Sequence, residues 1–256
     1  MSATDANTVN VLGYEVSTAG LAGDVDAGWQ LMRSGQAGGY VACANPHSLV
    51  VAAQDAEFAE ALHEADVLLP DGAGIVLAGK VLRTPVSERV AGFEYFYETS
   101  RRANAEGGVR YFFLGSTQQV LDLIAERLAR EFPNIELVGT WSPPYKPEFS
   151  EEDNAAMHAA IQAAQPDVVW VGMTAPKQEK WIHLNAVAGG APLYAAIGAV
   201  FDFYAGTVKR SPEWAGRLGL EWLPRLLREP RRLWRRNFVS TPLFLGRILR
   251  QALFGN

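Results

Sequence analysis

The sequence predicts an α/β protein of the Rossmann-like type: a mostly parallel sheet with helices on both faces, followed by a basic helical C-terminal appendage. Short apolar runs alternate with longer segments of helical type along most of the chain, which is typical of βαβ units. The apolar runs are continuous, as expected for parallel strands that are buried on both faces. At 256 residues the chain can form a full hydrophobic core. We expect the α/β core at 1–206 and the appendage at 207–256.

Six strands follow from the apolar runs. They are predicted at 39–44, 66–70, 109–114, 135–139, 167–172 and 192–198. Six helices are expected between them, at 47–64, 73–82, 92–106, 117–131, 151–164 and 176–187. Ser150 and Asp153 have the spacing of a capping box at the start of the fifth helix. Pro176 suits the first turn of the sixth, where its missing N–H leaves no hydrogen bond unmade.

Asn45 follows the first strand directly, in a turn that continues through Pro46 and His47. Two interpretations of Asn45 remain open. It could bond the local backbone while Pro46 begins the helix, or its amide could bind a sugar or a base. His47 falls in the first helical turn, where we expect a solvated or locally bonded imidazole rather than a catalytic one.

Asp71 and Gly72 follow the second strand. Asp71 could cap the helix at 73–82. Alternatively, its carboxylate lies in the crevice at the carboxyl ends of the strands, where open α/β sheets bind ligands, and accepts a proton from an attacking hydroxyl. The Gly-x-Gly at 72–74 does not extend to a dinucleotide fingerprint, because the third glycine position holds Leu77. An NAD site is therefore disfavoured.

Gly115 and Ser116 follow the third strand and open the helix at 117–131. Small residues and the N–H groups of a helix N-terminus form a reasonable cradle for a diphosphate. Ser116 or Thr117 could equally be an ordinary helix cap. The sequence leaves both interpretations open.

The last two strands also end in polar residues. Lys177 and Gln178 follow the strand at 167–172, and Asp202, Lys209 and Arg210 follow the strand at 192–198. Consecutive parallel strands thus carry polar groups at the same end of the sheet, where ligands bind. Because N–H groups and cations gather there, an anion is the expected ligand.

Charge is divided unevenly along the chain. Residues 207–256 contain eleven Lys or Arg and three Glu, a net charge of +8, and the overall charge of −5 leaves −13 for residues 1–206. An acidic body with a basic tail suits nucleic acid, anionic lipid or a phosphorylated substrate as a partner.

The end of the tail has the pattern of an amphipathic helix. From Phe244 onward apolar pairs alternate with Arg247 and Arg250, which gives a cationic face and an apolar face centred on Leu245 and Leu249. Such a helix could lie at a membrane surface or dock on the protein's own core. The arginines and tryptophan at 231–236 favour the membrane, because this combination is typical of the headgroup level.

Several kinds of location and site are disfavoured. The single Cys43 rules out an internal disulfide, the first residues lack the pattern of a signal peptide, and no run reaches the roughly 18 apolar residues of a spanning helix. We expect a cytoplasmic protein attached peripherally to the inner face of the plasma membrane. There is no P-loop, no nucleophile elbow, no metal-ligand spacing of histidines and no Asp-x-Asp pair at the predicted strand ends. No metal cofactor is expected, so Lys and Arg would neutralise a bound diphosphate.

Seven ordered motifs carry a resemblance to a known family. They are Cys-Ala-Asn-Pro at 43–46, Pro-Asp-Gly at 70–72, Arg-Val-Ala-Gly at 89–92, Phe-Phe-Leu-Gly-Ser at 112–116, Pro-Lys-Gln-Glu at 176–179, Phe-Asp-Phe-Tyr-Ala-Gly at 201–206, and the two segments Leu-Glu-Trp-Leu-Pro-Arg-Leu and Glu-Pro-Arg-Arg-Leu within 220–233. With these motifs the chain resembles the WecG/TagA/CpsF glycosyltransferases, from about Val11 to Asn237.

The resemblance implies an inverting, metal-independent transfer of a hexose or N-acetylhexosamine from a UDP-sugar to a polyprenyl-diphosphate-linked saccharide. It places the proposed base on Asp71, and it brings Asn45 and Gln178 to the nucleotide sugar. The family's Thr-x-Asn motif falls on Cys43 and Asn45, so a thiol replaces a hydroxyl and the hydrogen bond from position 43 is in doubt.

The resemblance also implies a C-terminal appendage that reaches the membrane. We expect residues 220–256 to meet an anionic membrane surface, and Arg225, Arg228 and Arg231 to help Lys177, Lys209 and Arg210 offset the charge of the leaving diphosphate. Two other classes of function remain. One is a nucleotide-sugar-modifying or hydrolytic Rossmann enzyme, and the other is a nucleic-acid-binding module, which the acidic body disfavours. Donor sugar, acceptor, linkage and a homo-oligomeric state stay open.

Overall fold

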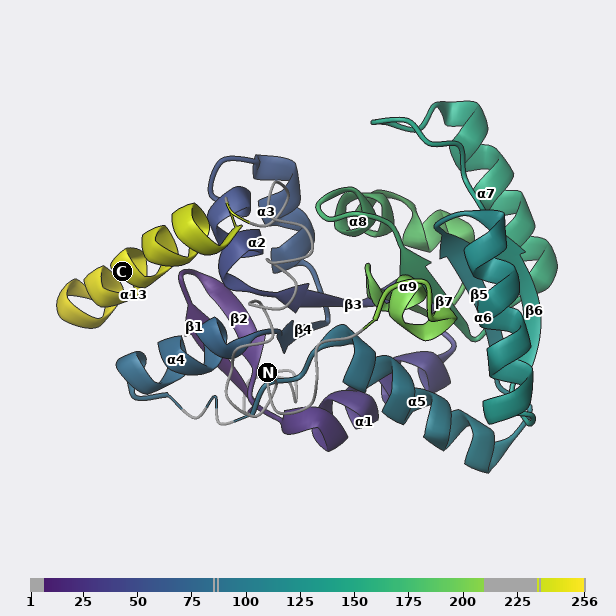
Figure 1. The fold of residues 1–256 in the computed structure, drawn as a ribbon, viewed down its shortest axis with the longest axis horizontal. Helices are drawn as coiled ribbons and strands as arrows, with labels where there is room; N and C mark the ends of the chain where they lie inside the picture. Colours follow the sequence, from purple (N-terminus) through teal and green to yellow (C-terminus); the bar gives the residue numbers. More distant parts are fainter. Residues whose placement is uncertain (1–6, 85, 87, 210–233, 235, 256) are drawn as a thin grey trace.

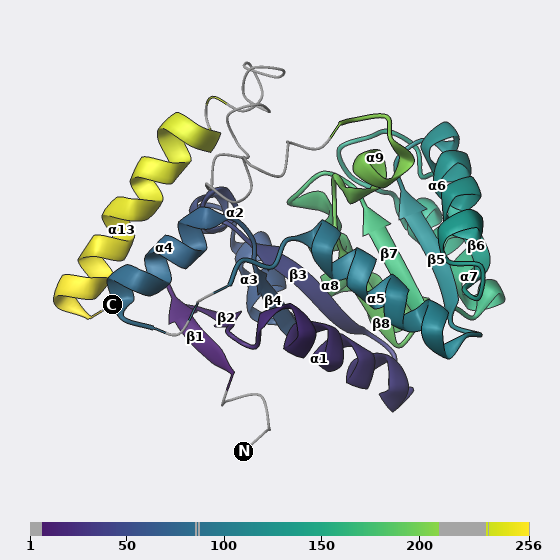
Figure 2. The same cartoon turned by 60° about the horizontal axis from the view of Figure 1, so that its bottom comes forward.

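The computed structural model describes residues 7–84, 86, 88–209, 234 and 236–255. Its centre is a six-stranded sheet in the order β4-β3-β8-β7-β5-β6 (Figures 1 and 2), and every neighbouring pair is parallel. The strands are β3 (Gly39–Ala44), β4 (Val67–Pro70), β5 (Arg110–Gly115), β6 (Glu136–Trp141), β7 (Val168–Gly172) and β8 (Leu193–Ala196). The predicted α/β class and all six predicted strands are confirmed, with ends that move by one or two residues.

The helices between the strands are also where the sequence predicts them. They are α2 (Pro46–Ala52), α3 (Ala56–His63), α4 (Ala73–Leu82), α5 (Gly92–Glu106), α6 (Gln118–Glu131), α7 (Glu151–Ala164) and α8 (Lys177–Gly189). The capping box of Ser150 and Asp153 at the start of α7 is confirmed. Pro176 lies one position earlier than expected, at the N-cap of α8.

The prediction of one helix at 47–64 is wrong, because the chain forms two. Asp55 interrupts the helical pattern with an extended backbone, and its carboxylate accepts a hydrogen bond of 3.1 Å from the N–H of Phe58. This side-chain cap begins a second helix, since Asp competes with helical hydrogen bonds and favours the N-cap position.

Further elements were not predicted. An antiparallel hairpin of β1 (Thr8–Val11) and β2 (Tyr14–Ser17) precedes α1 (Gly20–Ser34), and the short α9 (Val200–Ala205) follows β8. Near the end of the chain an unpredicted π-helical turn, η2 (Arg236–Ser240), leads into α13 (Thr241–Phe254), the helix that the amphipathic pattern from Phe244 onward predicted.

Two buried clusters cover the two faces of the sheet. On one face α1, α5, α6 and α9 pack through Trp29, Tyr95, Phe96, Ile124 and Phe201 against strand residues such as Val41 and Trp170. On the other face α2, α3, α7 and α8 contribute Leu49, Phe58, Met157, Ile161, Trp181 and Ile182. Successive strand residues thus serve opposite layers, as the continuous apolar runs require.

The last helix belongs to the second cluster. Helix α13 lies beside α4 at the β4 end of the sheet (Figures 1 and 2), and its Phe244 and Ile248 are fully buried. The Gln251 side chain joins it to the hairpin, accepting from the N–H of Leu12 at 3.0 Å and donating to the carbonyl of Asn10 at 3.2 Å. In the described part of the chain no helix has the length and hydropathy needed to cross a bilayer.

Candidate active site

The carboxyl ends of four adjacent strands bring the predicted polar residues together. In the order β4-β3-β8-β7, Asp71 and Asn45 directly follow β4 and β3, and Gln178 lies in the first turn of α8, the helix after β7. Ala44 pairs with Pro70 in the sheet, and the N–H of Asp71 donates to the carbonyl of Ala44 at 2.8 Å. These ends form the edge at which open α/β sheets bind ligands.

In the turn after β3, Asn45 is the helix cap. Its Oδ1 accepts from the N–H groups of His47 at 3.1 Å and Ser48 at 3.0 Å, and Ser48 Oγ accepts from the N–H of Asn45 at 2.8 Å. The local interpretation of Asn45 is therefore correct for its oxygen. The Nδ2 group has no partner among the described residues and remains a donor for a ligand.

The His47 imidazole bonds to a residue far away in the sequence and not to its own turn, contrary to the expected local bond. Its Nδ1 lies 2.8 Å from Ser240 Oγ, just before α13. Burial, followed by the charge of Arg236, lowers the pKa of His47, so the ring is neutral near pH 7. The turn that holds Asn45 is thus bonded to the start of the last helix.

In the turn after β4, Asp71 is not the helix cap that one interpretation predicted. That position belongs to Gly72, whose φ of +96° lies in the region that favours glycine. Asp71 stands one residue earlier, at the end of the strand, which agrees with a role in the crevice.

Arg89 lies at the same carboxyl-end edge of the sheet, and no role was predicted for it from the sequence. The N–H of the next residue, Val90, donates to the carbonyl of Pro70 at 3.0 Å, which holds this segment beside the end of β4. The Arg89 guanidinium is 3.6 Å from the carboxylate of Glu94. Its place in the Arg-Val-Ala-Gly motif was the signal that could have identified it.

After β7, Gln178 and Glu179 are both buried, with 4% and 2% of their surfaces exposed. Gln178 Oε1 accepts from the N–H of Met173 at 3.3 Å, and its Nε2 donates to Glu179 Oε1 at 2.8 Å. Burial raises the pKa of Glu179 to about 7. A carboxyl group with a strongly shifted pKa is a candidate for a functional role. Glu179 was not predicted as a site residue from the sequence.

Cys43 lies on β3 among these groups. Its thiol donates to the carbonyl of Ala196 on β8, with an S···O distance of 3.8 Å. Burial, followed by the charges of Asp71 and Glu179, raises the pKa of Cys43 well above its usual value. The sulfur is therefore a neutral thiol and is not activated as a nucleophile.

Gly115 and Ser116 lie at the end of β5, next to β7. Gly115 has a φ of +128°, and a Cβ atom there would come within 2.4 Å of the carbonyl oxygen of Gly172. Only glycine fits this approach. Ser116 donates its N–H to the same oxygen at 3.1 Å, and the helix cap is Thr117, whose Oγ1 accepts from Val120. The Ser116 N–H is thus already bonded within the protein.

Of the predicted Lys and Arg residues, two lie in the part of the chain that the structure describes. Lys177 turns toward the segment after β6, where its Nζ donates to the Lys146 carbonyl at 2.5 Å and lies 3.5 Å from the ring centroid of Phe149. Lys209 is exposed. Arg210, Arg225, Arg228 and Arg231 lie outside the described residues.

Asp202 has a local role in the turn after α9. Its Oδ1 accepts from Thr207 Oγ1 at 3.4 Å, and its carbonyl accepts from the N–H of Val208 at 3.2 Å. Within the ranges that the structure describes, no cluster of three or more His, Cys, Asp or Glu side chains could hold a metal ion.

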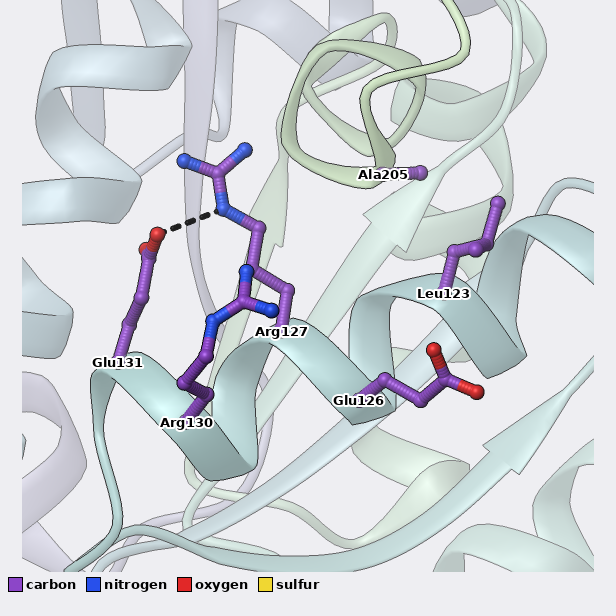
Figure 3. A pocket seen from close by; sticks show the side chains of 6 residues that line it. All are labelled: Leu123, Glu126, Arg127, Arg130, Glu131 and Ala205. Atoms are coloured by element: carbon purple, nitrogen blue, oxygen red, sulfur yellow. Dashed lines mark hydrogen bonds and ion pairs between the residues drawn. The ribbon is translucent and has the colours of Figure 1, made fainter.

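A pocket between α6 and α9 lies apart from these turns (Figure 3). Its central cation, Arg127, is 2.9 Å from the Glu131 carboxylate and donates to the Tyr204 carbonyl at 2.8 Å. The bond to Tyr204 joins α6 to α9 and Glu131 pairs with Arg127 within α6, so we interpret the pocket as a packing junction rather than as an anion site.

Known proteins resemble this chain over most of its length. Residues 9–256 match the family described as "Glycosyl transferase WecG/TagA/CpsF family". A relative from Bacillus spizizenii is 34% identical over 213 residues, which cover 83% of this chain and 79% of the relative. One from Bacillus subtilis is 31% identical over 84% of this chain and 80% of its own length, and one from Staphylococcus aureus is 27% identical over 82% and 79%. All three are described as N-acetylglucosaminyldiphosphoundecaprenol N-acetyl-beta-D-mannosaminyltransferases.

Proposed function

The chain belongs to the WecG/TagA/CpsF family of glycosyltransferases, and from this premise we propose that it transfers an N-acetylhexosamine from a UDP-sugar to a polyprenyl-diphosphate-linked saccharide. Two observations support the proposal. The family model matches residues 9–256, and Asp71, Asn45 and Gln178 lie at the same edge of the sheet. The names of the relatives favour N-acetylmannosamine as the sugar and N-acetylglucosamine on diphosphoundecaprenol as the acceptor.

The proposed reaction is a single in-line displacement that inverts the anomeric carbon. The Asp71 carboxylate takes the proton of the acceptor hydroxyl while the hydroxyl oxygen bonds to the anomeric carbon. The bond from that carbon to the diphosphate breaks, and its electron pair leaves with UDP. Holding both substrates at one edge makes this attack effectively intramolecular.

Asn45 and Gln178 are proposed to hold the nucleotide sugar. The Asn45 amide is fixed by its capping bonds and keeps Nδ2 as a donor. Lys209, Arg210 and the tail residues Arg225, Arg228 and Arg231 are proposed to offset the charge of the leaving diphosphate, the task that a metal ion performs elsewhere. Lys177 joins them only if it leaves the Lys146 carbonyl.

We propose that α13 meets the membrane with the side that does not pack on the core. The predicted apolar face is centred on Leu245 and Leu249, but Leu245 packs against the second of the two buried clusters. Leu249, Leu253 and Phe254 are 54%, 75% and 78% exposed, and Arg247 and Arg250 lie on the same helix. Apolar side chains with arginines suit an anionic membrane surface. This attachment would bring the site to its lipid-linked acceptor on the cytoplasmic side.

The proposal is tested by measuring UDP release from a panel of UDP-sugars, with and without a short-chain N-acetylglucosaminyl-diphosphate lipid. Transfer predicts UDP release and a disaccharide product that both require the lipid. Equal UDP release without the lipid would identify a hydrolytic or nucleotide-sugar-modifying enzyme instead.

A further inference from the structure

Glu179 is a buried carboxyl without a cation. Only 2% of its surface is exposed, and Oε2 is buried with no hydrogen-bond partner. No Lys or Arg in the described part of the chain pairs with it, because Lys180 bonds to Asp55 and Glu57 and Lys177 to the Lys146 carbonyl. A buried carboxylate that lacks a cation, and one of whose oxygens has no donor, is strongly disfavoured.

Its other oxygen holds Gln178. Glu179 Oε1 accepts from Gln178 Nε2 at 2.8 Å, while the Met173 N–H donates to Gln178 Oε1 at 3.3 Å. Both amide atoms lie 3.5 Å from where a Cβ of Gly198 would stand, so the amide rests against the chain just after β8. Glu179 thereby sets which way the Gln178 donor points.

We propose that Glu179 is a positioning residue for glycosyl transfer, which as a neutral carboxylic acid holds the Gln178 amide in the orientation that meets the nucleotide sugar. The neutral form keeps Oε1 as an acceptor and places a proton, not a charge, at the unpartnered Oε2. The inference rests on the proposed function, because that function makes Gln178 a residue that touches the donor.

The surroundings of Glu179 give this role a pH dependence. The Cys43 thiol of β3 feels the charge of Glu179, and Asp71 after β4 and Asp24 of α1 act on the same thiol. At Glu179 itself, the hydrogen bond from Gln178 and one from its own backbone favour the carboxylate, but burial outweighs them. Burial raises its pKa to about 7, so the neutral form is lost as the pH rises above that value.

The test compares Glu179→Gln, Glu179→Ala and the exposed control Glu152→Ala in transfer assays at pH 6 and pH 8.5. The Gln variant keeps the acceptor oxygen and replaces the O–H group by an N–H group. We expect its KM for the UDP-sugar to stay within about threefold of the wild-type value at pH 6 and to be insensitive to pH, whereas the wild-type KM rises at pH 8.5. The Ala variant should raise KM about tenfold at both pH values, and the control should match the wild type.

Two results overturn the inference. A Gln variant as impaired as a folded Ala variant would mean that the carboxylate itself is required, and an Ala variant equal to the wild type would mean that Gln178 needs no support. If the Ala variant does not fold, the pH profile of the Gln variant decides.

Infrared difference spectra separate this inference from the proposed function. At pH 6 the wild type should show a protonated-carboxyl band that is missing in Glu179→Gln. If this band is present but the protein transfers sugar to no acceptor, only the proposed function is contradicted. If the band is absent from the wild type, Glu179 is not neutral and this inference is wrong.

Discussion

Gly74 lies directly against Pro46: a Cβ atom on Gly74 would come within 2.3 Å of Pro46 Cγ. The two residues belong to the helices that follow Asp71 and Asn45. The turns after β3 and β4 therefore pack together without space for one methyl group. This contact holds the proposed base and the capping amide beside each other.

Gly74→Ala should therefore destabilise the protein by about 1–3 kcal/mol, the usual effect of an overpacked contact, despite the better helix propensity of alanine. Gly246→Ala in α13 is the matched control, since nothing lies within 4 Å of its Cβ position. Chemical denaturation measures both. Equal midpoints for the two variants would show that the turns separate easily.

Asp71→Asn should lower the transfer rate by about two to four decades, the range for losing a general base, and leave UDP binding largely intact. Asp122→Asn on the exposed side of α6 is the control. Steady-state rates and calorimetric UDP titration check this. Near-normal turnover in Asp71→Asn would show that Asp71 is not the general base.

Transfer should persist in excess EDTA. Lys and Arg are proposed to neutralise the leaving diphosphate, and the described residues offer no metal-ligand cluster. Initial rates with EDTA, and after adding magnesium or manganese, make the comparison. Activity lost to EDTA and restored by either ion would contradict the cation-based account.

Asp24 should make stability depend on pH. It is fully buried, Ser17 Oγ donates to its Oδ1, and its Oδ2 has no partner. Burial raises the pKa of Asp24 from 3.8 to about 6, with Ser17 opposing the shift and Glu88 adding to it. The stability from the neutral form is fully present below pH 4 and is lost as the pH rises through about 6.

Asp24→Asn removes this ionisation. Relative to the wild type, the variant should gain on the order of 2–3 kcal/mol between pH 4 and pH 7. Urea unfolding at both values measures the gain. A difference between the two proteins that is the same at pH 4 and pH 7 would show that Asp24 does not titrate in this range.

The two sides of α13 should respond differently to substitution. Leu249→Ser with Leu253→Ser should leave the unfolding midpoint unchanged and reduce the salt-resistant binding to anionic vesicles. Arg247→Gln with Arg250→Gln should reduce the salt-sensitive part, by about 1 kcal/mol for each charge. Phe244→Ala, on the docked side, should instead cost about 3–5 kcal/mol of stability. Vesicle sedimentation at low and high salt, with thermal unfolding, distinguishes these effects. Unchanged sedimentation of the Leu249 variant would refute the proposed membrane side.

The sheet could be predicted because its signal is local. Runs such as 111–114 and 168–171 are apolar at every position, which few structures other than a strand buried on both faces require. The hairpin at 8–17 gives no such signal, since its short strands mix Val with Asn, Glu and Thr and gain their stability from β4, α3 and α4 and from the bond to Gln251 of α13. The break at Asp55 depends on one capping bond, which the apolar periodicity of 47–64 conceals.

The site was predictable in position but not in detail. Strand ends and motifs identified Asn45, Asp71 and Gln178. Nothing in the order Lys177-Gln178-Glu179-Lys180 indicates that the glutamate is buried while Lys177 turns to the Lys146 carbonyl, because tertiary packing decides which way each side chain points. The cap role of Asn45 is compatible with its proposed role toward a ligand, since they use different atoms of one amide.

The bond between Gln251 and Leu12 spans 239 positions of the chain. During synthesis the hairpin leaves the ribosome long before α13, whose Gln251 bonds to it. A two-stranded hairpin is at best marginally stable alone, so we expect β1 and β2 to stay loosely attached until α13 docks. Docking of α13 thus closes this side of the fold only after the whole sheet has been synthesised, and nascent chains arrested before Thr241 should present the hairpin to proteases.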